Sequence, residues 1–450
     1  MTIDFIILAA GKGSRMAGEE PKVLSSLGGR PMAQHLLDTV KSIPGSRSNL
    51  VLGYKATKVK DALIAEKKDQ FFIQRQQLGT GHAVKHAFKG LRKNSVSLVL
   101  YGDVPLVEKK TLLSLARIAN KSCLGVLTFK KKNPLGYGRI IRGESGEVEK
   151  IVEEKEASSS QKIIKEVNSG ILAIKTSQLK NFVPKINNKN SAKEYYLTDL
   201  IAIAKKAGIR VEALLIEDNY QLLGANNQQE LHDLERSYQR RNAEKLIAKG
   251  INIKDSSRID IRGELDISRG AEIDVNSVIE GTNKIGKNVF IGPNCYIKDS
   301  IIKANSIIRA NTVIENSVVG KGCDIGPFAR IRGGTELLPG SELGNFVEAN
   351  RSIIGPGSKA KHLTYLGDAE LGKKVNIGAG TITCNYDGNR KHPTKLKDNV
   401  FIGSNTSLVA PITVNEGGYT GAGSVITKDV PKGKLAIGRG KQVNLRKKKK

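Results

Sequence analysis

Residues 285–297 read Ile-Gly-Lys-Asn-Val-Phe-Ile-Gly-Pro-Asn-Cys-Tyr-Ile, so that an isoleucine stands at every sixth position. A helix would repeat its apolar residues every three or four positions and a half-buried strand every two, and a period of six fits neither. The period is typical of a β-solenoid, because stacked coils place each aliphatic side chain above its equivalent in the next coil. The spacing continues through Ile302, Ile308, Ile314, Val319, Ile325, Ile331, Leu337 and Leu343. We therefore expect residues 251–450 to form a parallel β-helix of hexapeptide repeats.

Two stretches, 344–365 and 378–401, interrupt this repeat. We expect both to be insertions on the coil. Insertions on a repeat scaffold commonly carry function, so the sequence predicts a functional site on these two stretches.

The chain of 450 residues is too long for one ordinary core, and its composition changes near residue 250. Residues 228–249 show helical spacing and end at Gly250, and glycine commonly terminates helices. We expect three parts: a first domain over 1–227, a linker helix over 228–250, and the β-helix with a basic tail over 251–450.

The net charge is +29, from 73 Lys and Arg against 44 Asp and Glu, which would suit a polyanionic partner. The charge is spread along the chain, however, and aromatic residues make up only 5% with no Trp, so a specific nucleic-acid surface is not expected. The basic cluster Arg446–Lys450 is interpreted as a solvated end.

Four scattered cysteines without a C-x-x-C pair, together with the absence of a signal pattern at the start, favour a cytoplasmic location. No run of eighteen apolar residues occurs, so an integral membrane protein is not expected.

The first half alternates apolar runs, such as Phe5–Ala10 and Val96–Tyr101, with segments of helical spacing, such as Pro31–Val40. This alternation predicts an α/β fold with a doubly wound, Rossmann-like sheet. Ligands of such sheets bind beyond the carboxyl ends of the strands. The polar residues that follow the apolar runs are therefore the candidates for function.

The first such segment is Leu8-Ala-Ala-Gly-Lys-Gly-Ser-Arg-Met16, followed by Pro21-Lys22. Gly11 and Gly13 let backbone N–H groups approach a phosphate, and Arg15 and Lys22 add positive charge. The loop lacks the Gly-Lys-Ser/Thr ending of a P-loop and the third glycine of a dinucleotide fingerprint.

Two more segments follow later runs. Gln74-Arg-Gln-Gln-Leu-Gly-Thr-Gly-His82 offers amides that donate and accept hydrogen bonds, as reading a nucleobase requires, although it could instead be a polar helix start capped by Thr80. Asp103 follows the apolar run Val96–Tyr101, with only Gly102 between them. Magnesium commonly takes one or two protein oxygens, so Asp103 is a candidate ligand.

Together these motifs closely resemble the sugar-phosphate nucleotidyltransferases. The resemblance implies Mg²⁺ as a cofactor, held by Asp103 and Asn226, and an aminosugar contacted by Gly138, Glu153 and Asn168. Glu154 repeats the acidic side chain of Glu153, so the sequence leaves open which of the two is meant. The nucleotide contacts implied are Leu8, Ala9, Ala10, Gly11, Arg15, Lys22, Gln74, Gln77, Gly79, Thr80, Tyr101 and Gly102.

The interrupted part of the repeat carries Asn345-Phe-Val-Glu348, Lys361-His-Leu-Thr-Tyr-Leu-Gly-Asp368, Asn376-Ile-Gly-Ala-Gly380 and Cys384-Asn-Tyr-Asp-Gly388. Taken alone, His362 would be interpreted as a structural histidine. With the first half, these motifs closely resemble the family of bifunctional N-acetylglucosamine-1-phosphate uridyltransferases and glucosamine-1-phosphate acetyltransferases. The match runs from about Asp4 to Arg439.

The resemblance implies that His362 takes a proton from the amino group of glucosamine 1-phosphate, which then attacks acetyl-CoA. The Asn385–Tyr386 backbone would supply the oxyanion donor. The sugar-phosphate contacts implied are Arg332, Asn350, Tyr365 and Asn376, and the acetyl-CoA contacts are Ala379, Asn385, Tyr386, Ser404, Ala422 and Arg439.

The acetylated sugar phosphate would then attack UTP, giving UDP-N-acetylglucosamine and pyrophosphate. The resemblance also implies a left-handed β-helix and a homotrimer. One position departs from the family, which commonly has Lys where this chain has Asn350 followed by Arg351, so phosphate affinity at the acetyltransferase site stays open. Two alternatives stay open as well: a single-activity sugar nucleotidyltransferase with a structural β-helix, and a polyanion-binding protein, suggested by charge alone.

Overall fold

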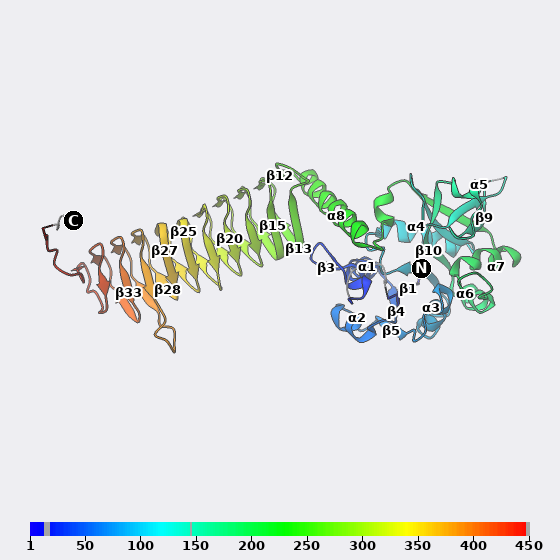
Figure 1. Cartoon of the computed structure of the whole chain (residues 1–450), viewed down its shortest axis with the longest axis horizontal. Helices are drawn as coiled ribbons and strands as arrows, with labels where there is room; N and C mark the ends of the chain where they lie inside the picture. The colour runs from blue at the N-terminus through cyan, green and yellow to red at the C-terminus, as the bar shows by residue number, and fades with distance from the viewer. Residues whose placement is uncertain (13–18, 145, 447–450) are drawn as a thin grey trace. The chain divides into compact units, whose positions relative to one another are not determined.

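The computed structural model describes residues 1–12, 19–144 and 146–446. They divide into two compact units, Met1–Ser237 and Tyr238–Lys450 (Figure 1). The division falls within helix α8 (Gln228–Ala248), in the segment for which the sequence predicted a helix.

Within the described residues, the first unit is built on a sheet of nine strands. Strands β1 (Ile3–Ala9), β4 (Ser46–Leu52), β5 (Gln70–Ile73) and β6 (Val96–Tyr101) run parallel, with β1 between β4 and β6. Strand β10 (Glu166–Lys175) lies antiparallel between β6 and β7 (Leu124–Lys130), and β11 (Val211–Ile216) runs parallel to β7. The hairpin of β8 (Arg139–Arg142) and β9 (Val148–Val152) joins the sheet through β10.

Helices cover both faces of this sheet, because side chains alternate along each strand. On β1, Phe5 and Ile7 belong to a core shared with α1 (Met32–Lys41) and α4 (Lys109–Asn120). Ile6 belongs to the other core, shared with α3 (Thr80–His86), α6 (Thr176–Phe182) and α7 (Leu200–Lys206). The shorter helices are α2 (Ala56–Ala62) and α5 (Ser159–Lys162). The sheet is therefore doubly wound, as the sequence predicted.

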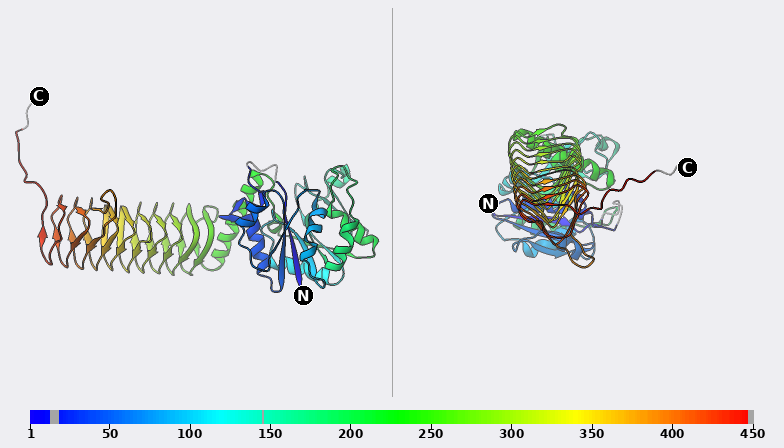
Figure 2. Two further views of the ribbon diagram at one scale, coloured as in Figure 1. Left: turned by 90° about the horizontal axis from the view of Figure 1, so that it is seen from below. Right: turned by 90° about the vertical axis from the view of Figure 1, so that its left-hand side faces the viewer.

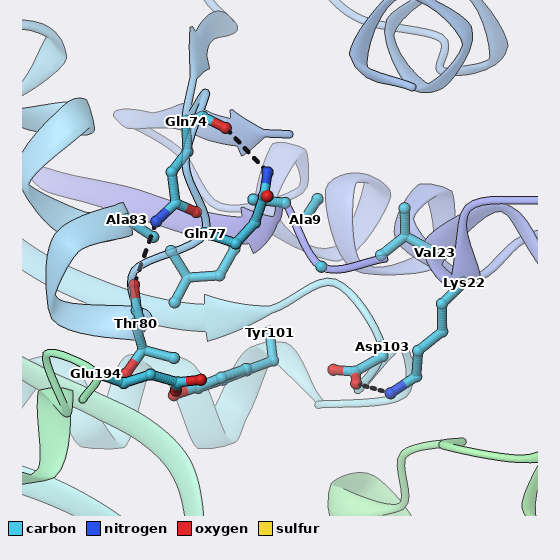
Figure 3. A pocket seen from close by; sticks show the side chains of 14 residues that line it. Ala9, Lys22, Val23, Gln74, Gln77, Thr80, Ala83, Tyr101, Asp103 and Glu194 are labelled. Carbon is cyan, nitrogen blue, oxygen red and sulfur yellow. Dashed lines mark hydrogen bonds and ion pairs between the residues drawn. The ribbon is translucent and has the colours of Figure 1, made fainter. Parts of the chain in front are cut away.

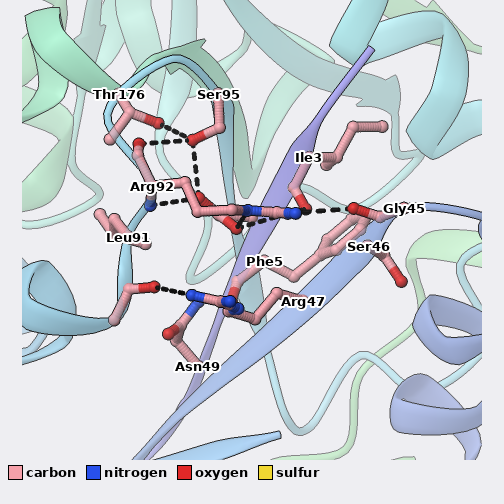
Figure 4. Close-up of polar contacts among 12 residues, drawn as sticks. Ile3, Phe5, Gly45, Ser46, Arg47, Asn49, Leu91, Arg92, Ser95 and Thr176 are labelled. Atoms are coloured by element: carbon pink, nitrogen blue, oxygen red, sulfur yellow. Dashed lines mark hydrogen bonds and ion pairs between the residues drawn. The ribbon is translucent and has the colours of Figure 1, made fainter. Parts of the chain in front are cut away.

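A buried charge lies at the amino end of β1. Asp4 is fully buried, and its carboxylate accepts hydrogen bonds from the backbone and side chain of Arg92 at 2.8 Å and from the hydroxyl of Ser95 at 2.6 Å. Figure 4 shows Arg92 reaching on to the carbonyl oxygens of Ile3 and Gly45, and Ser95 meeting Thr176. With its carboxylate satisfied in this way, Asp4 anchors the start of the strand, and the opposite, carboxyl end of the sheet remains for a ligand.

The second unit is a parallel β-helix of stacked coils (Figure 2). Ile279, Ile297, Ile314 and Ile331 pair one above the next on β15 (Ser277–Ile285), β17 (Tyr296–Lys298), β20 (Val313–Glu315) and β23 (Arg330–Arg332). Partners are 17 or 18 positions apart, which is three hexads per coil. All four isoleucines are buried, so the period of six is confirmed as the core of a solenoid.

Asparagines stand at the corners of successive coils. Asn276, Asn294 and Asn311 have φ of 59°, 59° and 58°, the left-handed region that asparagine tolerates better than most residues. Their side-chain amides donate from coil to coil at 3.0 and 3.2 Å. The corner is thus fixed both by backbone geometry and by a ladder of amides.

The prediction of an insertion at 344–365 is wrong. Residues 342–367 form the long strands β25 (Glu342–Asn350) and β27 (Lys359–Gly367), which pair with each other over seven residues at the ordinary spacing of 17 positions. The repeat was hidden because Ala349 and Ala360 stand where larger aliphatic residues stand elsewhere, and both are fully buried.

The second insertion is confirmed. Leu371 on β28 (Ala369–Leu371) pairs with Leu396 on β31 (Thr394–Leu396), 25 positions further on, whereas Ile354 on β26 (Ile353–Ile354) pairs with Leu371 after 17. The additional residues form a loop between β30 (Ile382–Cys384) and β31.

All four cysteines are free thiols, and Cys123, Cys295 and Cys323 are buried. Burial raises the pKa of the Cys295 thiol to about 11, so this side chain acts as a small apolar core residue. Among the helices in the described ranges, none has the length and apolar character needed to cross a membrane.

Candidate active sites

A cavity of about 300 Å³ opens at the carboxyl end of the sheet of the first unit. The loop after β1, the start of α3 and the end of β6 build its walls (Figure 3). It is lined by Leu8, Ala9, Ala10, Gly11, Lys22, Val23, Gln74, Gln77, Gly79, Thr80, Ala83, Tyr101, Asp103 and Glu194. The structure therefore brings together eleven of the seventeen residues predicted for the nucleotide, sugar and metal.

Gln74 is 2% exposed, and its amide orientation is fixed by two neighbours. Its Nε2 donates to the carbonyl oxygen of Gly79 at 3.2 Å and lies 3.0 Å from Nδ1 of His82. Because a carbonyl oxygen can only accept, the nitrogen must face Gly79, and Oε1 remains to accept a hydrogen bond in the cavity. This arrangement suits a base that presents an N–H group, as uracil does.

Thr80 does not cap helix α3, contrary to the alternative interpretation of this segment. The N-cap residue is Gly79, with φ of 106°, and the Thr80 hydroxyl accepts a hydrogen bond from the Leu197 backbone at 3.0 Å. A Cβ at position 79 would lie 2.7 Å from the backbone nitrogen and oxygen of Tyr195. Glycine is therefore required here by both conformation and space.

Lys22, Asp103 and Asn226 converge at the edge of the cavity. The Lys22 ammonium forms an ion pair with the Asp103 carboxylate and donates to Oδ1 of Asn226 at 2.7 Å. Glu230 accepts from both the backbone and the side-chain nitrogen of Asn226, at 2.7 and 3.0 Å, and thereby turns Oδ1 toward Lys22. The two side chains that the sequence proposed as metal ligands thus both direct an oxygen at one cation, the Lys22 ammonium.

The residues predicted for the sugar lie beside one another. The Asn168 backbone donates to the Gly138 carbonyl oxygen at 2.9 Å, and the Gly138 Cα faces the Glu153 carboxylate. Glu154 instead forms an ion pair with the buried Arg139 at 2.7 Å. Because Glu154 is committed to Arg139, the geometry favours Glu153 for contact with a sugar.

Burial raises the pKa of two groups here. The pKa of Glu153 lies above its ordinary value because of desolvation, although a hydrogen bond from Thr198 at 3.1 Å partly offsets the effect. Burial likewise raises the pKa of Tyr101. The ring of Tyr101 packs so closely on Gly170 that a Cβ there would lie 2.6 Å from it.

Five residues predicted for this site lie outside the lining of the cavity: Gly102, Gly138, Glu153, Asn168 and Asn226. Arg15 falls outside the described residues. Sequence reasoning did not assign Val23, Ala83 or Glu194, which line the cavity, nor the positioning residue Glu230. The pattern Asn227-x-x-Glu230, in which the Asn227 side chain accepts from the Glu230 backbone at 2.9 Å, is the helix-start signal that could have indicated Glu230.

In the second unit, His362 lies on β27 opposite Asn345 on β25. The Asn345 amide oxygen accepts from Nδ1 of His362 at 2.7 Å, which leaves Nε2 with the lone pair of a base. Both residues line an open hollow together with Leu343, Gly344 and Lys361. None of the other residues predicted for the acetyltransferase site belongs to its described lining.

A second polar group surrounds Gly367, and it includes Tyr365 and Asn385. A Cβ on Gly367 would lie 2.5 Å from the Tyr365 hydroxyl and 2.6 Å from Nδ2 of Asn385. Asn385 donates to Asp368, which also accepts two hydrogen bonds from Arg351 at 2.7 and 3.0 Å. These bonds hold the pKa of Asp368 below its ordinary value.

Asn350 and Arg332 are register partners on β25 and β23. Arg332 pairs with Glu348 at 2.7 Å, while Asn350 is 2% exposed and its Oδ1 has no hydrogen-bond partner within the described residues. The neighbouring Arg351 forms an ion pair with Asp368 at 2.7 Å, so its guanidinium already has a partner.

The oxyanion donor was expected in the backbone of Asn385 and Tyr386. The Asn385 N–H donates to the Thr383 carbonyl oxygen at 3.0 Å, so it is already used. Within the Asn385–Tyr386 backbone, the geometry therefore favours the Tyr386 N–H as the candidate oxyanion donor.

Three of the six residues predicted for acetyl-CoA form a column on successive coils. Ala379, Ser404 and Ala422 follow one another, because Gly378 packs on the Ser404 backbone and Gly403 on the Ala422 backbone. Arg439 donates to the Ala422 carbonyl oxygen at 2.7 Å. Asn376, the remaining predicted residue, lies half-buried on β29 (Asn376–Ile377).

Both halves of the chain match families of known proteins. Residues 5–167 match the MobA-like NTP transferase domain, residues 261–386 the GMPPB C-terminal domain, and residues 393–428 the hexapeptide repeat of succinyl-transferase. The chain is 49% identical to the bifunctional protein GlmU of Marinobacter nauticus over 98% of this chain and 97% of that protein. It is 46% identical to that of Idiomarina loihiensis and 44% identical to that of Acinetobacter baumannii, over 99% of this chain and 97% of each relative.

A nucleotidyltransferase sheet and a hexapeptide-repeat acyltransferase in one chain define a bifunctional transferase. Because the relatives match both halves, the alternative of one activity with a structural β-helix is not favoured. The chain belongs to the bifunctional GlmU family. It transfers an acetyl group from acetyl-CoA to glucosamine 1-phosphate and a uridyl group from UTP to the product, giving UDP-N-acetylglucosamine for cell-wall precursors.

Proposed function

We propose that the two reactions are carried by the residues assembled above, with acetyl transfer on the β-helix and uridyl transfer at the sheet. The observation that carries the first assignment is the bond between Asn345 and His362 at 2.7 Å. It fixes the tautomer in which Nε2 accepts a proton from the substrate ammonium, and an amine without that proton is the nucleophile that attacks a thioester. The Tyr386 N–H stabilises the charge that develops on the thioester oxygen.

At the sheet, the phosphate of N-acetylglucosamine 1-phosphate attacks the α-phosphate of UTP. Gln74 and Gln77 select the base, and Glu153 and Asn168 hold the sugar. Lys22 supplies positive charge beside the phosphates, and positioning carries most of such a reaction.

Asp103 and Asn226 are the residues that would hold Mg²⁺. The Lys22 ammonium already lies between their oxygens, so the pair fits a cation, and oxygen donors are those that Mg²⁺ prefers. The ion would supply charge neutralisation for the triphosphate.

We place the acetyltransferase site between copies of the chain in a homotrimer. Phe328, Phe346 and Leu363 are 50 to 60% exposed, and the two phenylalanine rings stack at 5.3 Å. Phe346 follows Asn345, the register partner of His362. Their φ values of 56°, 57° and 47° are unusual for bulky residues. A second copy covering this column would bury the apolar side chains and complete a hollow that holds only part of the predicted site. Light scattering at three times the chain mass of 48.7 kDa would support this, and a monomer would contradict it.

The four free cysteines support a reducing, cytoplasmic compartment.

The order of reactions is tested by giving the enzyme glucosamine 1-phosphate and UTP with and without acetyl-CoA. We expect pyrophosphate release to follow the release of CoA and to fall strongly when acetyl-CoA is omitted. Equal release without acetyl-CoA would contradict the proposed order.

A further inference from the structure

The position of Lys22 bears on how the metal enters. Its side chain is 11% exposed, and its ammonium bonds to Asp103 and to Asn226, the two residues proposed as ligands. Glu230 holds the Asn226 amide in the orientation that offers its oxygen to this cation. The cation position is therefore built by two oxygens, a positioning carboxylate and a tethered ammonium.

An ammonium and a divalent ion compete for these oxygens, because like charges at this distance repel each other. Mg²⁺ binds oxygen at about 2.0–2.1 Å and would repel a positive group hydrogen-bonded to the same atoms. Lys22 must leave both partners before an ion can take them. Its flexible stem starts from the short helix Lys22–Leu24 at the rim of the cavity, so the released ammonium remains beside the proposed phosphate site.

We infer that Lys22 is a tethered substitute for the metal: it occupies the metal position while the nucleotide is absent and moves to the phosphates when the ion binds. This inference rests on the proposed function. It makes metal and nucleotide binding cooperative, because the nucleotide offers Lys22 a new partner and so removes the competitor of the ion. By linkage, the ion must strengthen nucleotide binding by the same factor.

The test is metal binding without turnover, with Mn²⁺ as a paramagnetic probe for Mg²⁺ and free Mn²⁺ measured by electron paramagnetic resonance. In the absence of UTP, we expect Lys22→Met to bind Mn²⁺ about fivefold to tenfold more tightly than the wild type, since one charged hydrogen-bonded competitor has been removed. Lys22→Arg, which keeps a charge at this position, should show no such gain.

A matched control separates occupancy from general charge. Lys12 lies on the same loop but places its ammonium over the Tyr54 ring, 5.7 Å from the centroid. Lys12→Met removes one positive charge without opening the metal position, so Mn²⁺ affinity should change less than twofold. An equal gain in Lys12→Met and Lys22→Met would overturn the inference.

A second readout follows Lys22 itself. Reductive methylation of Lys22, measured by peptide mass spectrometry, should be slow in the metal-free enzyme and accelerate severalfold with Mg²⁺ alone. An unchanged rate would mean that the ammonium does not leave.

Asp103→Asn distinguishes the two levels of the proposal. Loss of Mn²⁺ binding in Asp103→Asn with no gain in Lys22→Met would leave the metal site intact and overturn the role of Lys22. If Asp103→Asn binds Mn²⁺ as tightly as the wild type, with or without UTP, the proposed metal site itself is overturned.

Discussion

The imidazole of His362 and the amide of Asn345 meet across one step of the β-helix, with Nδ1 2.7 Å from Oδ1. We expect His362→Ala to slow acetyl transfer by roughly 10²–10⁴, the usual contribution of a positioned general base. Uridyl transfer from supplied N-acetylglucosamine 1-phosphate should stay near the wild-type rate. Separate assays of CoA and pyrophosphate release check both statements, and a matching loss of uridyl transfer would contradict the separation of the sites.

Asp103→Ala should have the reverse effect, because it removes the charged oxygen proposed for the metal. Uridyl transfer should become negligible at every Mg²⁺ concentration while acetyl transfer continues. Near-normal turnover at saturating Mg²⁺ would show that Asp103 is not the ligand.

Mixing the His362→Ala and Asp103→Ala proteins should restore synthesis of UDP-N-acetylglucosamine from glucosamine 1-phosphate, since the intermediate can pass through solution. If both proteins are folded and retain their remaining activity but the mixture makes no product, the two sites are coupled.

Asn350→Lys should lower the KM for glucosamine 1-phosphate severalfold, because an ammonium beside Arg332 adds attraction for the phosphate. The substitution removes an amide oxygen without a hydrogen-bond partner in the described part of the chain, so little is lost with it. Asn350→Leu is the control for size without charge. An unchanged KM in Asn350→Lys would mean that another cation already serves the phosphate.

Glu153→Gln should separate stability from activity. Burial raises the native pKa of Glu153 above the ordinary 4.5, so the native state binds more protons than the unfolded chain between 4.5 and that raised value, and stability falls as the pH rises through this window. A glutamine at position 153 does not ionise, so the variant avoids this loss of stability. The melting temperature of the full-length variant should exceed that of the wild type by about 2 °C at pH 8, with no difference near pH 4.

The same variant should lose uridyl transfer, because the amide replaces one of the two accepting oxygens of the carboxylate with an N–H donor. Calorimetry at both pH values and a pyrophosphate assay check the two effects. A lower melting temperature at pH 8 would show that the ionised Glu153 stabilises the fold.

The sequence predicted the β-helix well because its core obeys a strict local period, as Ile297 and Ile314 illustrate. It failed at 344–365, where Ala349 and Ala360 keep the register with smaller side chains. In the first unit, strands β1 and β6 were visible as apolar runs. Strands β8 to β11 were missed. Strands β8 and β9 are short and rich in charged residues, and β10 and β11 join the sheet through β6 and β7, which lie far away in the sequence.

The candidate sites divide in the same way. Gln74 and Asp103 could be predicted because each follows an apolar run and carries the chemistry required. The helix-start pattern Asn227-x-x-Glu230 could have indicated Glu230 as a capping residue, but not its role in orienting Asn226. That role depends on the bond between Asn226 and Lys22, which joins positions 204 residues apart. The choice between Glu153 and Glu154 needed the structure, because only the position of Arg139 separates them.

The coil length also gives this half of the chain a structural reading frame. Because each core residue faces its equivalent 17 or 18 positions away, deleting one full coil, such as residues 287–303, would leave every remaining aliphatic residue facing inward. Deleting nine residues would shift the frame and turn polar side chains into the core. Changes of length in the β-helix should therefore be tolerated only in whole coils or as loops that leave the coil, like the one between β30 and β31.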